Sequence, residues 1–311
     1  MKVNRVGQNV LPILPALIWG TAFVAQSVGA DYMGAFTFNA ARAVIAFVFL
    51  LGLLGLRRLV QKKSGSLQPL GSRRDLMVGG LCCGTALTVA SYLQQKGLET
   101  TTSGKAGFIT ALYIVLVPII GCLMGRRVPR AVWLSVALAV GGLYCLCITE
   151  DLSIAVGDFY VLACALCFAV QIMTVDHFSS RVDGVALSCA QFFVMTLISS
   201  LGVLSESLPD PALASVWLLP VLYVGVFSSG VAYTLQILAQ KDSDPAVVSL
   251  LMSLESVFAV IAGAIILGDR MSGREYFGCA LMLAAVVLAQ IPLPDAGRKA
   301  APDCRGPFAE S

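Results

Sequence analysis

Residues 35–63, AFTFNAARAVIAFVFLLGLLGLRRLVQKK, decide the fold class of this chain. Residues 35–56 are strongly apolar with Arg42 as their one charge, and four cations follow in the next seven residues. A bilayer core of about 30 Å is crossed by roughly 20 apolar residues in a helix. The run is solidly apolar rather than alternating, which favours a helix over a barrel strand. We therefore predict a transmembrane helix with a basic end.

The remainder of the chain has the same character. It has 311 residues, of which 58% are hydrophobic and 13% charged, with a mean hydropathy of +0.85. A soluble domain carries about 25% charged residues, and a globule of this length cannot bury so much apolar surface. We predict an all-α membrane protein with ten transmembrane helices. The predicted spans are residues 10–28, 35–56, 76–96, 104–124, 131–149, 157–176, 185–204, 216–239, 246–267 and 275–292.

The distribution of cations predicts the orientation. With the N-terminus inside, sixteen of the 21 Lys and Arg residues lie on the inner side and four on the outer side, while Arg42 lies within a span. Cytoplasmic loops are enriched in Lys and Arg. We therefore expect a multi-pass plasma-membrane protein with both termini in the cytoplasm: residues 1–9 form the N-terminus, and residues 293–311 form a disordered tail.

A weak internal repeat divides the ten spans into two halves. The segment ASYLQ at 90–94 lines up with AYTLQ at 232–236. Because five is an odd number, two five-helix halves must have opposite orientations in the membrane. Such inverted repeats place a binding site at their interface near the bilayer midplane. The predicted repeats are residues 10–149 and 157–292.

Several short motifs occur in a specific order along the chain. They are LIWGTAF at 17–23, NAAR at 39–42, GFITALY at 107–113 followed by Pro118, LESVF at 254–258 and LGDR at 267–270. In this order and spacing they resemble the EamA-type group of the drug/metabolite transporter superfamily, over residues 10–292. The resemblance implies two inverted five-helix repeats, alternating access, and export of small metabolites or drugs that is often driven by protons.

The chain departs from the family pattern at two places. The sequence is MGRR at 124–127 and LGDR at 267–270, where Leu-Gly-Glu-Arg is frequent, and Ser256 stands where a proline often follows the glutamate. The first departure leaves the expected fold unchanged. The second removes the reason to expect a proline kink in the ninth span.

Two charged residues lie well inside predicted spans, Arg42 in the second and Glu255 in the ninth. A charge at a helix centre costs about 2.5–3.5 kcal/mol on insertion scales. Burial favours the neutral form of a carboxyl group, so a buried carboxyl can exchange protons near neutral pH. We predict that Glu255 couples transport to protons or binds a substrate cation, and that Arg42 contacts substrate. In the alternative interpretation the two side chains pair structurally, Glu255 hydrogen-bonds a neighbouring helix, or Arg42 extends towards the outer face.

Polar residues in the eighth span share one helical face. Ser229, Tyr233, Gln236 and Gln240 are spaced by four, three and four residues, and the third span carries Ser91 and Gln94 at matching positions. Such stripes suit a cavity lining; interhelical hydrogen bonds of about 0.6 kcal/mol are the alternative. Trp19, Gln26, Tyr113 and Gln171 are further lining candidates, with ordinary helix packing as the alternative. The predicted substrate-binding set is Trp19, Gln26, Arg42, Ser91, Gln94, Tyr113, Gln171, Tyr233 and Gln236.

The sequence lacks the residue patterns that metal sites, ATP hydrolysis and enzymatic activity require. His177 is the only histidine, the cysteines lie mostly in apolar runs, including Cys164-x-x-Cys167, and no G-x-x-x-x-G-K-[ST] motif occurs. We therefore expect no metal, no cofactor, no ATP hydrolysis and no enzymatic activity. A net charge of +3 gives no reason to expect a nucleic-acid partner. The oligomeric state stays open.

These observations predict a secondary active transporter that exports a small metabolite or drug-like compound, with the bilayer and a small-molecule substrate as its partners. One alternative is a nucleotide-sugar or phosphate-ester exchanger of the same superfamily, which would need cavity cations to bind phosphates. A weaker alternative is an intramembrane transferase.

Overall fold

The structure is a computed structural model that describes residues 11–66, 68–101, 103–147, 155–241, 243–262, 265 and 272–290. The predicted N-terminal segment 1–9, the tail 293–311 and the motif at 267–270 lie outside these residues. Within the described ranges the secondary structure is helical and contains no strand, apart from an isolated bridge between Gly71 and Val182. The prediction of an all-α protein is confirmed.

The helices of the first half follow the predicted spans closely. They are α2 Ile13–Tyr32, α3 Ala35–Lys63, α4 Arg73–Leu98, the pair α5 Ser103–Ala111 and α6 Tyr113–Leu123, and α7 Arg130–Cys147. The second half consists of α8 Val156–Ser179, α9 Gly184–Val203, α10 Ala214–Tyr223, a π-helical segment Val224–Ala232, α11 Tyr233–Gln240, α12 Pro245–Met252, α13 Glu255–Ala262 and α14 Gly273–Gln290.

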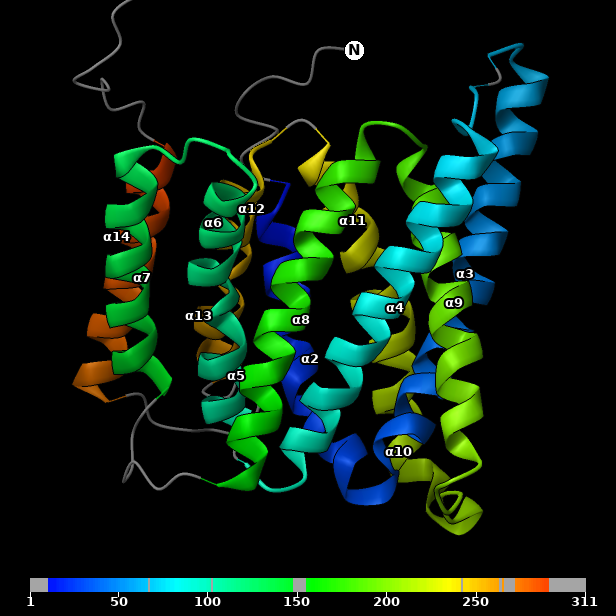
Figure 1. The fold of residues 1–311 in the computed structure, drawn as a ribbon. Helices are drawn as coiled ribbons and strands as arrows, with labels where there is room; N and C mark the ends of the chain where they lie inside the picture. The colour runs from blue at the N-terminus through cyan, green and yellow to red at the C-terminus, as the bar shows by residue number, and fades with distance from the viewer. Residues whose placement is uncertain are drawn as a thin grey trace, which may run out of the picture.

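The arrangement is a bundle of ten spans with opposite orientations in its two halves. Eight helical segments are long and apolar enough to cross a membrane, and α7 and α14 pack against each other at one edge of the bundle (Figure 1). Helix α2 begins and α14 ends at the upper end in Figure 1. Helix α2 runs downward from this end, whereas α8, the first helix of the second half, runs upward to it. The prediction of ten helices in two inverted repeats is confirmed.

Two of the spans are interrupted near their middle. The fourth breaks at Leu112 between α5 and α6, and the ninth breaks between Met252 and Glu255, where α12 ends and α13 begins. No proline lies at the second break. Instead, the Ser253 hydroxyl donates to the Leu250 carbonyl oxygen at 2.7 Å. Serine hydroxyls that hydrogen-bond a carbonyl oxygen of the preceding turn often bend helices. Ser253 therefore accounts for the interruption, which was not expected from the sequence because this span lacks the proline.

Close helix contacts occur at glycines. A Cβ at Gly20 of α2 would lie 2.6 Å from the Glu255 carbonyl oxygen of α13, and a Cβ at Gly142 of α7 would lie 3.0 Å from the Gly278 carbonyl oxygen of α14. Small residues allow such approaches between membrane helices. The neighbouring Gly141 has no atom within 4 Å of an added Cβ, so it does not mediate a close contact.

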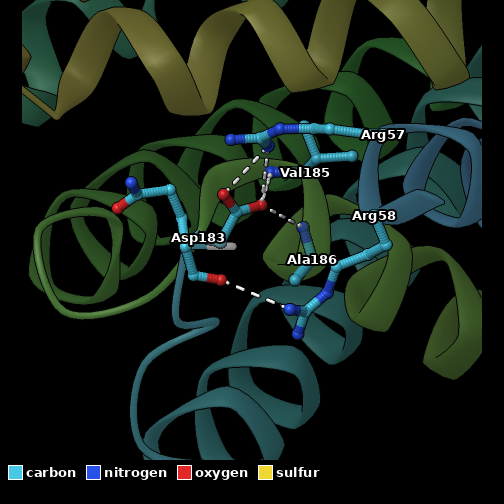
Figure 2. A network of polar contacts seen from close by, with 6 residues as sticks. Arg57, Arg58, Asp183, Val185 and Ala186 are labelled. Atoms are coloured by element: carbon cyan, nitrogen blue, oxygen red, sulfur yellow. Dashed lines mark hydrogen bonds and ion pairs between the residues drawn. The ribbon is translucent and has the colours of Figure 1, made fainter. Parts of the chain in front are cut away.

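A polar latch joins the α3–α4 loop to the start of α9 at the upper end of the bundle (Figure 2). Arg57 pairs with Asp183 at 2.9 Å, and Arg58 donates to the Gln68 carbonyl oxygen at 3.3 Å. The Asp183 carboxylate also accepts hydrogen bonds from the first backbone N–H groups of α9, at Val185 and Ala186, each at 3.1 Å. One carboxylate therefore caps α9 and holds α3 against it through Arg57.

A central cavity between the two repeats

Residues from both repeats enclose a cavity in the middle of the bundle. Its lining residues are Trp19, Phe23, Gln26, Arg42, Gln94, Thr110, Tyr113, Phe168, Gln171, Ile172, Ser228, Tyr233, Gln236, Met252 and Glu255. About 40 Å³ of this cavity is wide enough for water, which is room for a few water molecules. The side chains must therefore move apart before a molecule of metabolite size can enter.

Arg42 projects from α3 into the cavity and is only 2% exposed. Its Nη1 donates to Gln26 Oε1 at 3.1 Å and its Nη2 donates to Ser91 Oγ at 2.7 Å. Its Nε–H has no hydrogen-bond partner among the described residues. The guanidinium is thus held by neutral groups from α2 and α4, and part of its hydrogen-bonding capacity is unused.

Glu255 is the first residue of α13 and is 4% exposed. The Tyr113 hydroxyl, at the start of α6, donates to Glu255 Oε1 at 3.2 Å. Between the described residues no ion pair joins Glu255 to Arg42, although both line the same cavity. The alternative in which these two charges neutralise each other directly is therefore wrong for this conformation.

A ladder of glutamines extends from the cavity towards the upper end of the bundle. Gln236 Nε2 donates to Gln171 Oε1 and to Gln240 Oε1, each at 3.1 Å, and Gln240 Nε2 donates to the Ile172 carbonyl oxygen at 2.9 Å. Gln240 also lines an open polar bowl with Arg126, Asp176 and other residues. The Gln236–Gln171 bond joins α11 to α8, so interhelical hydrogen bonding, the alternative to a cavity lining, coexists with it: both glutamines also line the cavity.

The π-helical segment of the eighth span changes which serine faces the cavity. Trp19 Nε1 donates to the Ser228 carbonyl oxygen at 3.2 Å, and the Trp19 ring lies 4.9 Å from the Tyr233 ring, centroid to centroid. A π-helix has more residues per turn than an α-helix. For this reason Ser228 lines the cavity instead of Ser229, which α-helical spacing places on that face.

The model of the EamA-like transporter family matches residues 9–148 and again residues 155–290. The chain is 31% identical to an uncharacterized transporter of Archaeoglobus fulgidus, over 93% of this chain and 87% of that protein. The chain belongs to the EamA-like transporter family. Its two matched segments give the two repeats of the bundle, and it is a multi-pass membrane transporter.

Two further comparisons agree with this assignment. An uncharacterized transporter of Synechocystis sp. is 25% identical, over 92% of this chain and 91% of that protein. A solved crystal structure superposes with a TM-score of 0.76 at 19% identity, covering 92% of this chain and 97% of the other. At that identity the likeness shows the fold alone.

The structure brings together nine of the ten predicted site residues on the cavity, namely Trp19, Gln26, Arg42, Gln94, Tyr113, Gln171, Tyr233, Gln236 and Glu255. The tenth, Ser91, is not on the lining but accepts a hydrogen bond from Arg42. Their roles in substrate binding and proton coupling stay predictions. Four of these residues belong to the EamA motifs: Trp19, Arg42, Tyr113 and Glu255.

Several lining residues were not predicted, among them Thr110, Phe168 and Met252. Thr110 accepts from Gln94 Nε2 at 3.3 Å and lies within the GFITALY motif, which is the sequence signal that could have identified it. Apolar residues such as Phe168 and Met252 cannot be told from packing residues by sequence. In the part of the chain that the structure describes, no three His, Cys, Asp or Glu side chains group as metal ligands.

Proposed function

We propose that this EamA-family protein is a secondary active transporter that exports a small metabolite or drug-like compound across the plasma membrane by alternating access, with protons as the coupling ion. The observation that supports it is the juxtaposition, in one buried cavity between the inverted repeats, of a carboxyl group and a guanidinium that do not pair with each other. Intramembrane ionisable groups typically mark ion and substrate pathways.

The chemistry of coupling follows from the charge of the cavity. Arg42 carries a permanent positive charge, so the two groups sum to zero when Glu255 is ionised and to +1 when it is protonated. A cationic substrate is therefore favoured when Glu255 has lost its proton, and the two compete for the same carboxylate. Competition of this kind exchanges an incoming proton for an outgoing substrate, provided that the two states of Glu255 differ in affinity for the two conformations.

The small free volume supports alternating access. About 40 Å³ cannot hold a metabolite, so loading requires the repeats to separate at one end of the bundle. The excess of Lys and Arg on the side of the termini supports a cytoplasmic location for the upper end in Figure 1. The glutamine ladder, which reaches that end through Gln240, then lies on the path from the cytoplasm to the cavity.

The test is transport in sealed liposomes under an imposed pH gradient. A thermal-shift screen over amino acids, nucleobases, amines and common drugs first selects the substrate, because a ligand of the folded state raises its unfolding temperature. Flux of that substrate is then compared between wild type, Glu255→Gln and the control Glu99→Gln, which alters an exposed carboxylate paired with Lys96 at 2.6 Å. We expect proton-driven flux to be lost in Glu255→Gln and kept in Glu99→Gln. Undiminished proton-driven flux in Glu255→Gln would overturn the role of Glu255.

A further inference from the structure

The fourth and ninth spans, which are both interrupted, correspond to each other in the internal repeat, and their interruptions lie at corresponding residues. The repeat equates Gln94 with Gln236, an offset of 142 residues, and the same separation joins Tyr113 to Glu255. Tyr113 is the first residue of α6 and Glu255 is the first residue of α13. Each therefore begins the second half-helix of its span.

The backbone at the two breaks repeats this equivalence. At the first break, the Leu112 N–H donates to the Ile109 carbonyl oxygen and the Leu116 N–H donates to the Leu112 carbonyl oxygen. At the second break, the bonds from Leu254 to Leu251 and from Phe258 to Leu254 occupy the same offset positions. A single tight turn closed by an i→i−3 hydrogen bond thus interrupts both spans at equivalent positions, although one span has Pro118 and the other has serines.

The side chains at these corresponding positions, Tyr113 and Glu255, differ in chemistry and contact each other. The Tyr113 hydroxyl donates to Glu255 Oε1 at 3.2 Å, which joins the two half-helices across the interface between the repeats. A tyrosine hydroxyl donates to a carboxylate, whereas the acceptor weakens once that carboxyl takes up a proton. The bond therefore depends on the protonation state of Glu255.

We propose that the Tyr113–Glu255 hydrogen bond is the coupling link between the two repeats, with Tyr113 as the positioning residue that transmits a change in Glu255 protonation from the ninth span to the fourth. The inference rests on the proposed proton coupling at Glu255 and goes beyond it by naming the second element that responds. Half-helices at the midplane are suited to this role, because a broken helix can reorient one half while the other stays packed.

The surroundings of Glu255 leave few other groups for this role. Tyr233 of α11 and Cys164 of α8 are the other titratable groups that interact with the Tyr113–Glu255 pair, and Arg42 of α3 lines the same cavity. Helix α2, which packs along α13, faces Glu255 with Gly20, and its titratable residues Asp31 and Tyr32 lie at its far end. Thr110 is the cavity residue of α5, and α7, which also contacts α13, contributes no lining residue. Among the described residues, Tyr113 is the side chain that hydrogen-bonds Glu255 directly.

The test follows conformation instead of flux, so that it needs no identified substrate. Spin labels are placed on Leu123→Cys, at the end of α6, and Ser243→Cys, just before α12, in a full-length protein lacking other reactive cysteines. The distance distribution between the labels is recorded in liposomes from about pH 5.5 to 8.5, the range in which a buried carboxyl titrates. One interhelical hydrogen bond in a membrane supports a change in the ratio of the two populations of about 3- to 15-fold.

We expect the wild type and the control Tyr160→Phe, on the partly exposed face of α8, to show this pH-dependent change in population. Tyr113→Phe, which removes only a hydroxyl, should no longer show the pH-dependent change in population, while its unfolding temperature stays near that of the wild type. Glu255→Asp still titrates but is one methylene shorter, so it should behave like Tyr113→Phe. A wild-type response in both variants would overturn the coupling link and leave the proposed proton coupling standing. A response that persists in Glu255→Gln, or is absent from the wild type, would overturn the proton role of Glu255 itself.

Discussion

The contact between α2 and α13 at Gly20 supports a quantitative prediction. An alanine Cβ at this position would lie 2.6 Å from the Glu255 carbonyl oxygen, 2.7 Å from Phe258 Cβ and 2.8 Å from the Ala259 nitrogen. Two of these three atoms belong to the backbone, so no side-chain rotation relieves the overlap. The two helices must move apart until the oxygen contact reaches at least the 3.4 Å of an ordinary van der Waals contact.

The cost of this displacement follows from overpacking. Extra methyl groups forced into well-packed interiors cost about 1–3 kcal/mol. At about 1.5 °C per kcal/mol for a chain of 311 residues, we expect Gly20→Ala to lower the unfolding temperature in detergent by about 1.5–5 °C. Because the displaced oxygen belongs to Glu255, proton-driven flux should fall along with stability.

The matched control is Gly141→Ala, also within a membrane helix but with no atom within 4 Å of the added Cβ. Alanine has the higher helix propensity, by about 1 kcal/mol, so this variant should be as stable as the wild type or more stable. The measurement is thermal unfolding of both variants in the same detergent. Equal unfolding temperatures for Gly20→Ala and Gly141→Ala would refute the close contact between α2 and α13.

Three further predictions concern the latch, the π-helical segment and the orientation. Asp183→Ala removes both the α9 cap and the Arg57 pair, and it should lower the free energy of chemical unfolding by about 1–2 kcal/mol. Asp183→Asn keeps a capping oxygen and should lower this free energy by less than about 1 kcal/mol. Equal losses in the two variants would contradict the capping role. Trp19→Phe removes the donor to the Ser228 carbonyl oxygen and should speed amide exchange in residues 224–232 severalfold, while Trp217→Phe, at the exposed end of its span, should leave it unchanged. In sealed right-side-out vesicles, an impermeant thiol reagent should label Ser205→Cys and not Ser64→Cys; the reverse pattern would place the termini outside.

Much of the fold could be predicted from the sequence because bilayer thickness imposes a length on each apolar run. Most predicted spans match the helical segments within a few residues, whereas α3 extends seven residues beyond its predicted end and the predicted end of the ninth span lies outside the described residues. The odd number of spans per repeat requires the inversion. The breaks could not be predicted in the same way. Pro118 lies six residues beyond the break at Leu112, and the ninth span breaks at Ser253 and Leu254 without any proline.

The candidate site could likewise be predicted only in part from the sequence. Arg42 and Glu255 stand out in the sequence because each is expensive in a membrane, and both line the cavity. Their partners were also among the predicted site residues, but the sequence did not show which of them would pair with which charge. Ser91 and Gln26 hold Arg42, and Tyr113 holds Glu255, through bonds between residues up to 142 positions apart. A local pattern carries no information about which of several polar residues will meet across a helix interface.

The sequence by itself thus determined the class of protein, the number of spans, their alternation and the short list of charges that the bilayer cannot ignore, because these depend only on the transfer of each segment from water to lipid. The tertiary structure alone decided that Arg42 and Glu255 stay apart, that Ser228 rather than Ser229 lines the cavity, and that Tyr113 meets Glu255 at two equivalent helix breaks. These outcomes depend on how two inverted repeats pack against each other, and packing is a property of the whole bundle.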